Sequence, residues 1–262
     1  MIVFSAIVPH SPLLLPDIGK THVKKLAQTV AALADIEQRL YVTRPDTICV
    51  ISPHGQVLGD AFGINLSAQY ATSFKDFGDF KTAKTFRSDF LLIDRIQRSI
   101  RKDIPLALHS DETLDYGFGV PLHLLTEHLA NPTIIPVTTS GLDLKAHFEF
   151  GKAMRDEMLN SNKRVAVIAS ADLAHSLTKD APGGFSPRGA EFDAKIQELL
   201  AHRNVPGLLQ MDPTLCAEAK ECGLRAILIA LGLLDGIDYT ARVLSYEGPL
   251  GIGYLVSHLQ FS

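Results

Sequence analysis

The stretch IVFSAIVPH, residues 2–10, decides the fold class, because it is an uninterrupted apolar strand that runs directly into a histidine. The pattern returns in TICVISPH, residues 47–54, and in RVAVIASADLAH, residues 164–175. Strands of an α/β sheet deliver functional residues at their carboxyl ends. The repetition therefore predicts a sheet whose chemistry lies along one edge.

An amphipathic helix is expected between the first two of these strands, over residues 20–41. Its apolar positions follow a spacing of three and four: Val23, Leu26, Val30, Leu33, Ile36 and Leu40. Strand, helix and strand then form a βαβ unit, because parallel strands need such a crossover. The unit places His10 and His54 on the same edge of one sheet.

The rest of the chain continues this alternation. We expect helices near 88–101, from Pro121 onward, over 143–160, over 190–203 and over the apolar run 224–237. Further strands are expected over 132–140, 239–246 and 252–260. The prediction is a single catalytic domain, residues 1–262: an α/β fold with a mixed, largely parallel sheet, helices on both faces and a metal site at the carboxyl edge of the strands.

Composition excludes several classes of partner and site. With 25 basic against 29 acidic residues, the chain has no basic excess for nucleic acid. The longest apolar stretch is too short for a membrane span, and the proline-interrupted start does not read as a signal peptide, so we expect a cytoplasmic protein. Cys49, Cys216 and Cys222 form no CxxC pair, which argues against a disulfide framework or a cysteine zinc site and favours free core thiols.

A fourth strand-like run, ARVLSYEGPLG (residues 241–251), delivers Glu247. His10, His54 and Glu247 together match the ligand set of an open non-haem iron site. Each residue also has a plainer interpretation. A histidine beside a proline is often a hydrogen-bonded structural residue, and Glu247 could be a solvated turn carboxylate or a helix-capping partner.

The segment SADLAHS, residues 170–176, supplies a candidate for proton transfer. His175 could act as a general acid and base, since imidazole changes charge near neutral pH, and Asp172 could orient it. The alternative is structural, with Asp172 capping the following turn and His175 packing there.

Five segments in order, VPHSP (8–12), ISPHG (51–55), DYGFGVPLHLL (115–125), SADLAHS and YEGPLGIGYLV (246–256), resemble the class III extradiol ring-cleavage dioxygenases, such as the B subunit of protocatechuate 4,5-dioxygenase. The resemblance implies Fe(II) held by His10, His54 and Glu247, with His175 as acid and base. It also implies a catechol- or aminophenol-type substrate cleaved with O2, and a homodimer.

The chain departs from this family at Tyr116, where members of established activity often carry a histidine close to the substrate. A phenol can donate a hydrogen bond but does not titrate near neutrality. The chain is also similar to Memo and AmmeMemoRadiSam system B proteins. In Memo a cysteine replaces the carboxylate ligand and ring cleavage is not the accepted role, so Glu247 favours the iron enzyme. A third alternative is a zinc-dependent hydrolase, because two histidines and a carboxylate also bind catalytic Zn²⁺.

Overall fold

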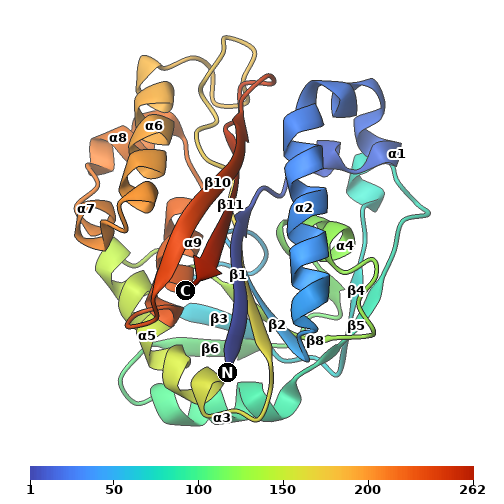
Figure 1. Cartoon of the computed structure of the whole chain (residues 1–262), viewed down its shortest axis with the longest axis vertical. Coiled ribbons are helices and arrows are strands. Elements are labelled where there is room, and N and C mark those ends of the chain that lie inside the picture. The colour runs from blue at the N-terminus through green and yellow to red at the C-terminus, as the bar shows by residue number, and fades with distance from the viewer.

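Four parallel strands in the order β1-β9-β2-β8 form the centre of the molecule, which a computed structural model describes over all residues, 1–262. The sheet continues through β11 and β10, which are antiparallel to their neighbours, and on the other side branches at β8 into β5-β4-β7 and β3-β6 (Figure 1). The strands are β1 (Ile2–Val8), β2 (Thr47–Ser52), β3 (Phe62–Asn65), β4 (Gln69–Thr72), β5 (Thr85–Ser88), β6 (Leu106–His109), β7 (Thr113–Leu114), β8 (Thr133–Thr138), β9 (Val165–Ser170), β10 (Tyr239–Glu247) and β11 (Tyr254–Phe261).

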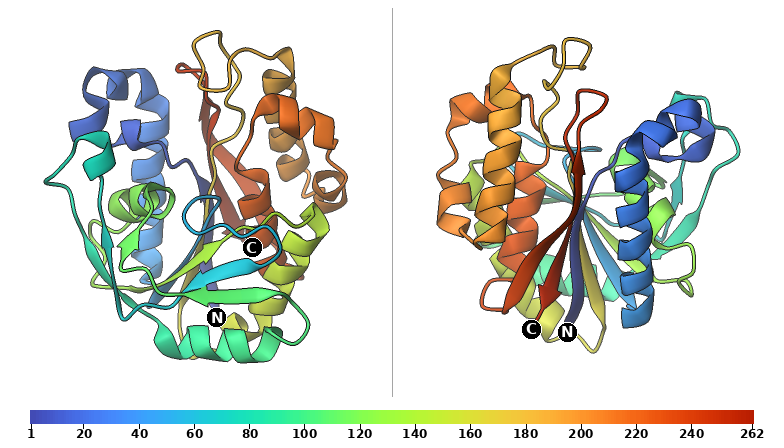
Figure 2. Two further views of the ribbon diagram at one scale, coloured as in Figure 1. Left: turned by 180° about the vertical axis from the view of Figure 1, so that it is seen from behind. Right: turned by 45° about the horizontal axis from the view of Figure 1, so that its top comes forward.

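Helices cover both faces of this sheet (Figure 2). The α-helices are α1 (Pro16–Gly19), α2 (Ala27–Thr43), α3 (Phe90–Ile100), α4 (Tyr116–Leu125), α5 (Leu144–Leu159), α6 (Pro187–Ala201), α7 (Val205–Leu209), α8 (Pro213–Ala219) and α9 (Leu224–Leu233). Three short 3₁₀ helices are η1 (Pro12–Leu14), η2 (Lys20–Leu26) and η3 (Lys75–Phe77). The predicted fold class, a mixed and mostly parallel sheet between two helical layers, is confirmed.

The two layers follow from the alternation of side chains along the central strands. In β2, Cys49 and Ile51 pack into the core formed with α3, α5, α6 and α9. Ile48 and Val50 point to the opposite face, into the core formed with α2 and α4. Burial on both faces explains why these strands read as continuous apolar runs.

Two local predictions were wrong. The helix expected from Pro121 onward is α4, which begins at Tyr116 and contains Pro121 in its interior. The Asp115 side chain starts this helix by accepting a hydrogen bond from the Gly117 N–H. The strand expected to run into His175 is β9, which ends at Ser170 and continues as a loop.

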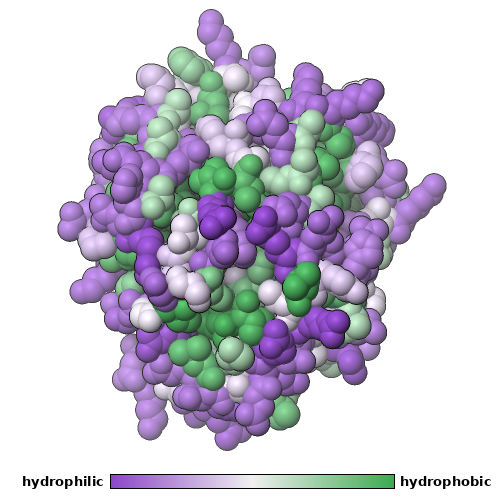
Figure 3. Space-filling model, viewed as in Figure 1, coloured by the Kyte–Doolittle hydropathy of each residue, from purple (hydrophilic) through white to green (hydrophobic).

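The surface is mixed in character. On the face in Figure 3, hydrophobic residues form small separate patches among hydrophilic ones. None of the helices combines the length and the apolar character that a membrane span requires.

Candidate metal centre

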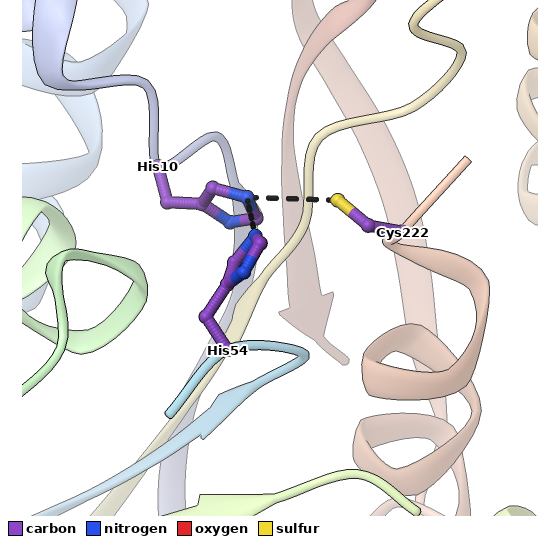
Figure 4. A group of neighbouring side chains, drawn as sticks. All are labelled: His10, His54 and Cys222. Atoms are coloured by element: carbon purple, nitrogen blue, oxygen red, sulfur yellow. Dashed lines mark hydrogen bonds between the residues drawn. The ribbon is translucent and has the colours of Figure 1, made fainter. Parts of the chain in front are cut away.

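Three donor side chains from remote parts of the chain converge at the carboxyl edge of the sheet (Figure 4). His10 follows β1, His54 follows β2, and Cys222 precedes α9. The two Nε2 atoms lie 3.1 Å apart, and the Cys222 Sγ lies 3.6 Å from the His10 Nε2. The donor atoms of all three lie within 4.8 Å of one another.

The ring of His10 is fixed by a hydrogen-bond relay that begins at a proline. Pro121 has no N–H, so the carbonyl of Gly117, four residues earlier, receives no helical hydrogen bond from it. The Ser170 hydroxyl donates to that carbonyl instead, and the Ser170 Oγ lies 2.9 Å from the His10 Nδ1. Because the serine proton is used, Nδ1–H of His10 must donate to Oγ, which leaves the Nε2 lone pair free to bind a metal.

His54 is positioned by a close approach of the backbone beneath it. A Cβ at Gly117 would lie 2.9 Å from the His54 Cβ, so only glycine allows α4 to start here. The Tyr116 hydroxyl lies 3.2 Å from the His54 Nε2, where it can donate a hydrogen bond. Burial lowers the pKa of His54 to about 4, with a further contribution from the nearby His10. Burial likewise lowers the pKa of His10 to about 3, so both imidazoles are neutral near pH 7.

Cys222 is the functional candidate that the sequence analysis missed. The absence of a CxxC pair predicts core thiols, yet the tertiary structure brings Cys222 to the two histidines. One signal was available, since ECGLRAIL places a cysteine just ahead of a helix, where the N-terminal dipole favours a thiolate. Burial raises the pKa of the Cys222 thiol well above its usual range, but a coordinated metal deprotonates a thiol outright.

The spacing of the three donors fits a transition metal. Metal–nitrogen bonds of about 2.1 Å and metal–sulfur bonds of about 2.3 Å in tetrahedral geometry give separations of about 3.4 Å between nitrogens and about 3.6 Å between nitrogen and sulfur. From the His10 Nε2, the observed separations are 3.1 Å to the His54 Nε2 and 3.6 Å to the Cys222 Sγ, and all three donor atoms lie within 4.8 Å of one another. His10, His54 and Cys222 can therefore hold one metal ion.

Asp172 and His175 lie in the loop after β9. The backbone N–H of His10 donates to Asp172 Oδ1, and Asp172 Oδ2 lies 3.6 Å from the His10 Nε2. Burial raises the pKa of Asp172 to about 6. The Nδ1 of His175 is buried without a hydrogen-bond partner. The structure thus places Asp172 beside His10, and His175 three residues further along the same loop.

Glu247 is not brought to this group. Its Oε1 accepts hydrogen bonds from the N–H and the hydroxyl of Thr29, both at 2.7 Å, in the first turn of α2. The strand order explains this. His10 and His54 follow β1 and β2, the two strands on either side of β9, whereas β11 and β1 lie between β10 and β9. The expected ligand therefore occupies the helix-capping role that was its alternative interpretation, and Cys222 lies beside the two histidines instead.

Comparison with known proteins agrees with the resemblance seen in the sequence. Protein CA_C1420 of Clostridium acetobutylicum is 28% identical over 264 residues, a match that covers 97% of this chain and 56% of that protein. The chain thus spans little more than half the length of this relative. The crystal structure of uncharacterized protein JW3007 from Escherichia coli K12 has a TM-score of 0.65 at 17% identity, covering 98% of this chain and 99% of that one, which shows a shared fold.

The family match extends over almost the whole chain. Residues 5–257 match the family described as the catalytic LigB subunit of aromatic ring-opening dioxygenase. This range contains His10, His54, Tyr116, Asp172, His175 and Cys222. The chain belongs to the LigB family of aromatic ring-opening dioxygenase catalytic subunits.

Proposed function

We propose that the chain binds Fe(II) through His10, His54 and Cys222 and opens the ring of a catechol- or aminophenol-type substrate with O2. The observation that carries the proposal is the convergence of two neutral imidazoles, with their Nε2 atoms 3.1 Å apart, in a member of a ring-opening family. When bound, a ferrous ion supplies a Lewis acid for the substrate oxygens and an electron relay to O2.

In this proposal, side chains of the protein transfer protons and orient the substrate and the ligands. His175 has an unpartnered Nδ1, so in this proposal it takes the proton of a substrate hydroxyl and later returns one. The Tyr116 hydroxyl, 3.2 Å from the His54 Nε2, is assigned to donate a hydrogen bond to the substrate. Asp172 holds the backbone of His10 through Oδ1 and so positions the first ligand.

The test is oxygen uptake by protein purified and reconstituted anaerobically with Fe²⁺. Catechol and 2-aminophenol should each be examined, and the expected result is consumption of one O2 per substrate with a coloured ring-opened product. Iron-replete protein that consumes no O2 with any diol or aminophenol would overturn the proposal.

His175→Ala separates the acid and base role from metal binding. We expect turnover to fall about 10²- to 10⁴-fold while iron content stays at the wild-type level. His202→Ala is the matched control, because His202 ends α6 on the exposed surface. Undiminished turnover in His175→Ala would remove this residue from the mechanism.

A second candidate function is a metal-binding protein that does not cleave rings, as implied by the similarity to Memo proteins. The observation in its favour is the donor set itself, because Cys222 offers a thiol where the iron dioxygenases use a carboxylate. Thiolates favour softer ions such as Zn²⁺, and a zinc site with an open position would also suit a hydrolase. Metal analysis of the freshly purified protein, read together with oxygen uptake, separates these functions.

A further inference from the structure

A cavity of about 390 Å³ lies between the start of α5, one side of α8 and the start of α9. Apolar side chains, among them Leu144 and Met211, form one part of its wall. Four charged residues also line it: Asp143, Lys220, Glu221 and Arg225. Small-molecule sites commonly have volumes of about 300–1,000 Å³ and combine apolar walls with a few polar groups. The cavity therefore has the size and the lining of such a site.

An acid and a base in this cavity face each other without forming an ion pair. Arg225 is the second residue of α9, and its Nε is buried without a hydrogen-bond partner. The Glu221 Oε2 accepts the Leu224 N–H at 2.8 Å instead of pairing with Arg225. The two charges still interact, since burial raises the pKa of Glu221 and the charge of Arg225 opposes that shift. One hydrogen bond does not exhaust the lone pairs of a carboxylate, so both groups retain capacity for a ligand.

The charged residues of the lining are two acids and two bases, so neither sign predominates. A ligand of a single charge would be attracted by one pair of residues and repelled by the other. A ligand that carries both charges can pair each of them with an opposite partner. Asp143 is already used as a helix cap, because its Oδ1 accepts the Ala146 N–H, and Lys220 is exposed to solvent. Glu221 and Arg225 are therefore the partners best placed for such a ligand.

We propose that this cavity binds a free α-amino acid with an apolar side chain, whose carboxylate pairs with Arg225 and whose ammonium group pairs with Glu221. A free α-amino acid carries both charges on one carbon, whereas a peptide carries them at opposite ends. A planar guanidinium holds a carboxylate through two parallel hydrogen bonds, and the apolar wall receives the side chain. Binding does not depend on ring cleavage, because neither His10 nor His54 lines this cavity.

The experiment is calorimetry with three probes that share one apolar chain. L-Leucine carries both charges, L-leucinamide lacks the carboxylate, and 4-methylpentanoate lacks the ammonium group. We expect the wild type to bind L-leucine about 10- to 100-fold more tightly than either of the other probes, because each missing charge leaves a charged side chain of the cavity without its partner.

Two variants assign the charges to their partners. Arg225→Gln should reduce the preference for L-leucine over L-leucinamide to about 1-fold and keep the preference over 4-methylpentanoate. Glu221→Gln should do the reverse, and its amide oxygen can still accept the Leu224 N–H. Glu218→Gln is the matched control and should keep both preferences, because Glu218 lies on α8 outside the cavity lining and pairs with Arg188.

Equal affinities of the wild type for the three probes, failure to bind L-leucine, or an undiminished preference in Arg225→Gln or Glu221→Gln would each overturn the proposal. If a glutamine variant does not fold, an undiminished preference in Arg225→Lys or Glu221→Asp overturns it in the same way. Amino acids also chelate metal ions, so the titrations are repeated after dialysis against a chelator, when L-leucine should bind as before. Binding that disappears with the metal would assign the amino acid to the metal centre and overturn the proposal.

Discussion

The candidate metal centre and the Glu247–Thr29 contact lie at the same edge of the sheet but differ in how their polar groups are paired. At the candidate centre, the Nε2 atoms of His10 and His54 lie 3.1 Å apart, beside the Cys222 sulfur. At the other contact, the Glu247 carboxylate accepts two hydrogen bonds from Thr29. The first group brings three donor atoms together that can hold a cation, whereas the Glu247 Oε1 is already paired with Thr29.

The contrast shows that residue type and strand position do not identify a ligand. Glu247 ends a strand that is parallel to β1, as a metal-binding carboxylate would, yet its Oε1 already accepts two hydrogen bonds from Thr29. Cys222 belongs to no strand and still faces the open centre. The useful criterion is whether a group's hydrogen-bonding capacity is left for a ligand.

The largest expected effect is loss of the metal on removing a donor. Cys222→Ala and His54→Ala should each lower metal affinity by more than about 100-fold, since loss of a supporting group alone costs 10- to 100-fold. Cys216→Ala is the control for thiol chemistry, because Cys216 lies outside the group. Equilibrium dialysis with Zn²⁺ and Fe²⁺ measures the affinities. Full metal binding by Cys222→Ala would show that Cys222 is not a ligand.

The next effect concerns Asp193, a carboxylate that is hydrogen-bonded within the protein and can still ionise. It accepts hydrogen bonds from the Ala174 N–H and the Tyr246 hydroxyl, and burial raises its pKa to about 6. A raised folded-state pKa stabilises the protein below pH 4, and this contribution disappears as the pH rises through 6.

Asp193→Asn tests this because the amide does not ionise. Relative to wild type, the variant should gain up to about 3 kcal/mol of unfolding free energy between pH 4 and pH 8. Urea denaturation at a series of pH values measures the difference. A difference that does not change with pH would show that the folded-state pKa is not raised.

A smaller effect is expected from Ser170→Ala, which removes the hydrogen bond that orients His10. Metal affinity should fall about 10- to 100-fold, because the imidazole can then adopt the other tautomer or rotate. Ser5→Ala is the matched control, since Ser5 is buried in the same strand that leads to His10 and its hydroxyl has no partner. Unchanged affinity in Ser170→Ala would assign the ring's orientation to packing alone.

The smallest effect is expected at Glu247. Glu247→Ala should cost about 1 kcal/mol of stability through loss of a helix cap, with metal affinity unchanged. Glu247→Gln keeps an acceptor for Thr29 and should recover most of that stability. Thermal denaturation and metal titration of both variants provide the measurements. Loss of metal binding in both variants would show that Glu247 is a ligand.

Much of the fold could be predicted from the sequence because its signals are local. The apolar runs that became β1, β2 and β9 are buried on both faces, and the periodic segments became α2, α3, α5 and α6. The start of α4 could not be predicted from Pro121, because the Asp115 cap and the Ser170 hydrogen bond compensate for a proline inside a helix. That compensation depends on β9, which is remote in sequence.

The sequence by itself determined the α/β layers, the family and the positions of His10 and His54 after parallel strands, because strand burial and the carboxyl-edge rule act over short stretches of chain. Only the tertiary structure decided that Cys222 joins them and that Glu247 caps α2. Those outcomes depend on the lateral order of strands and on which polar groups satisfy one another, and both are set by contacts between segments far apart in the chain.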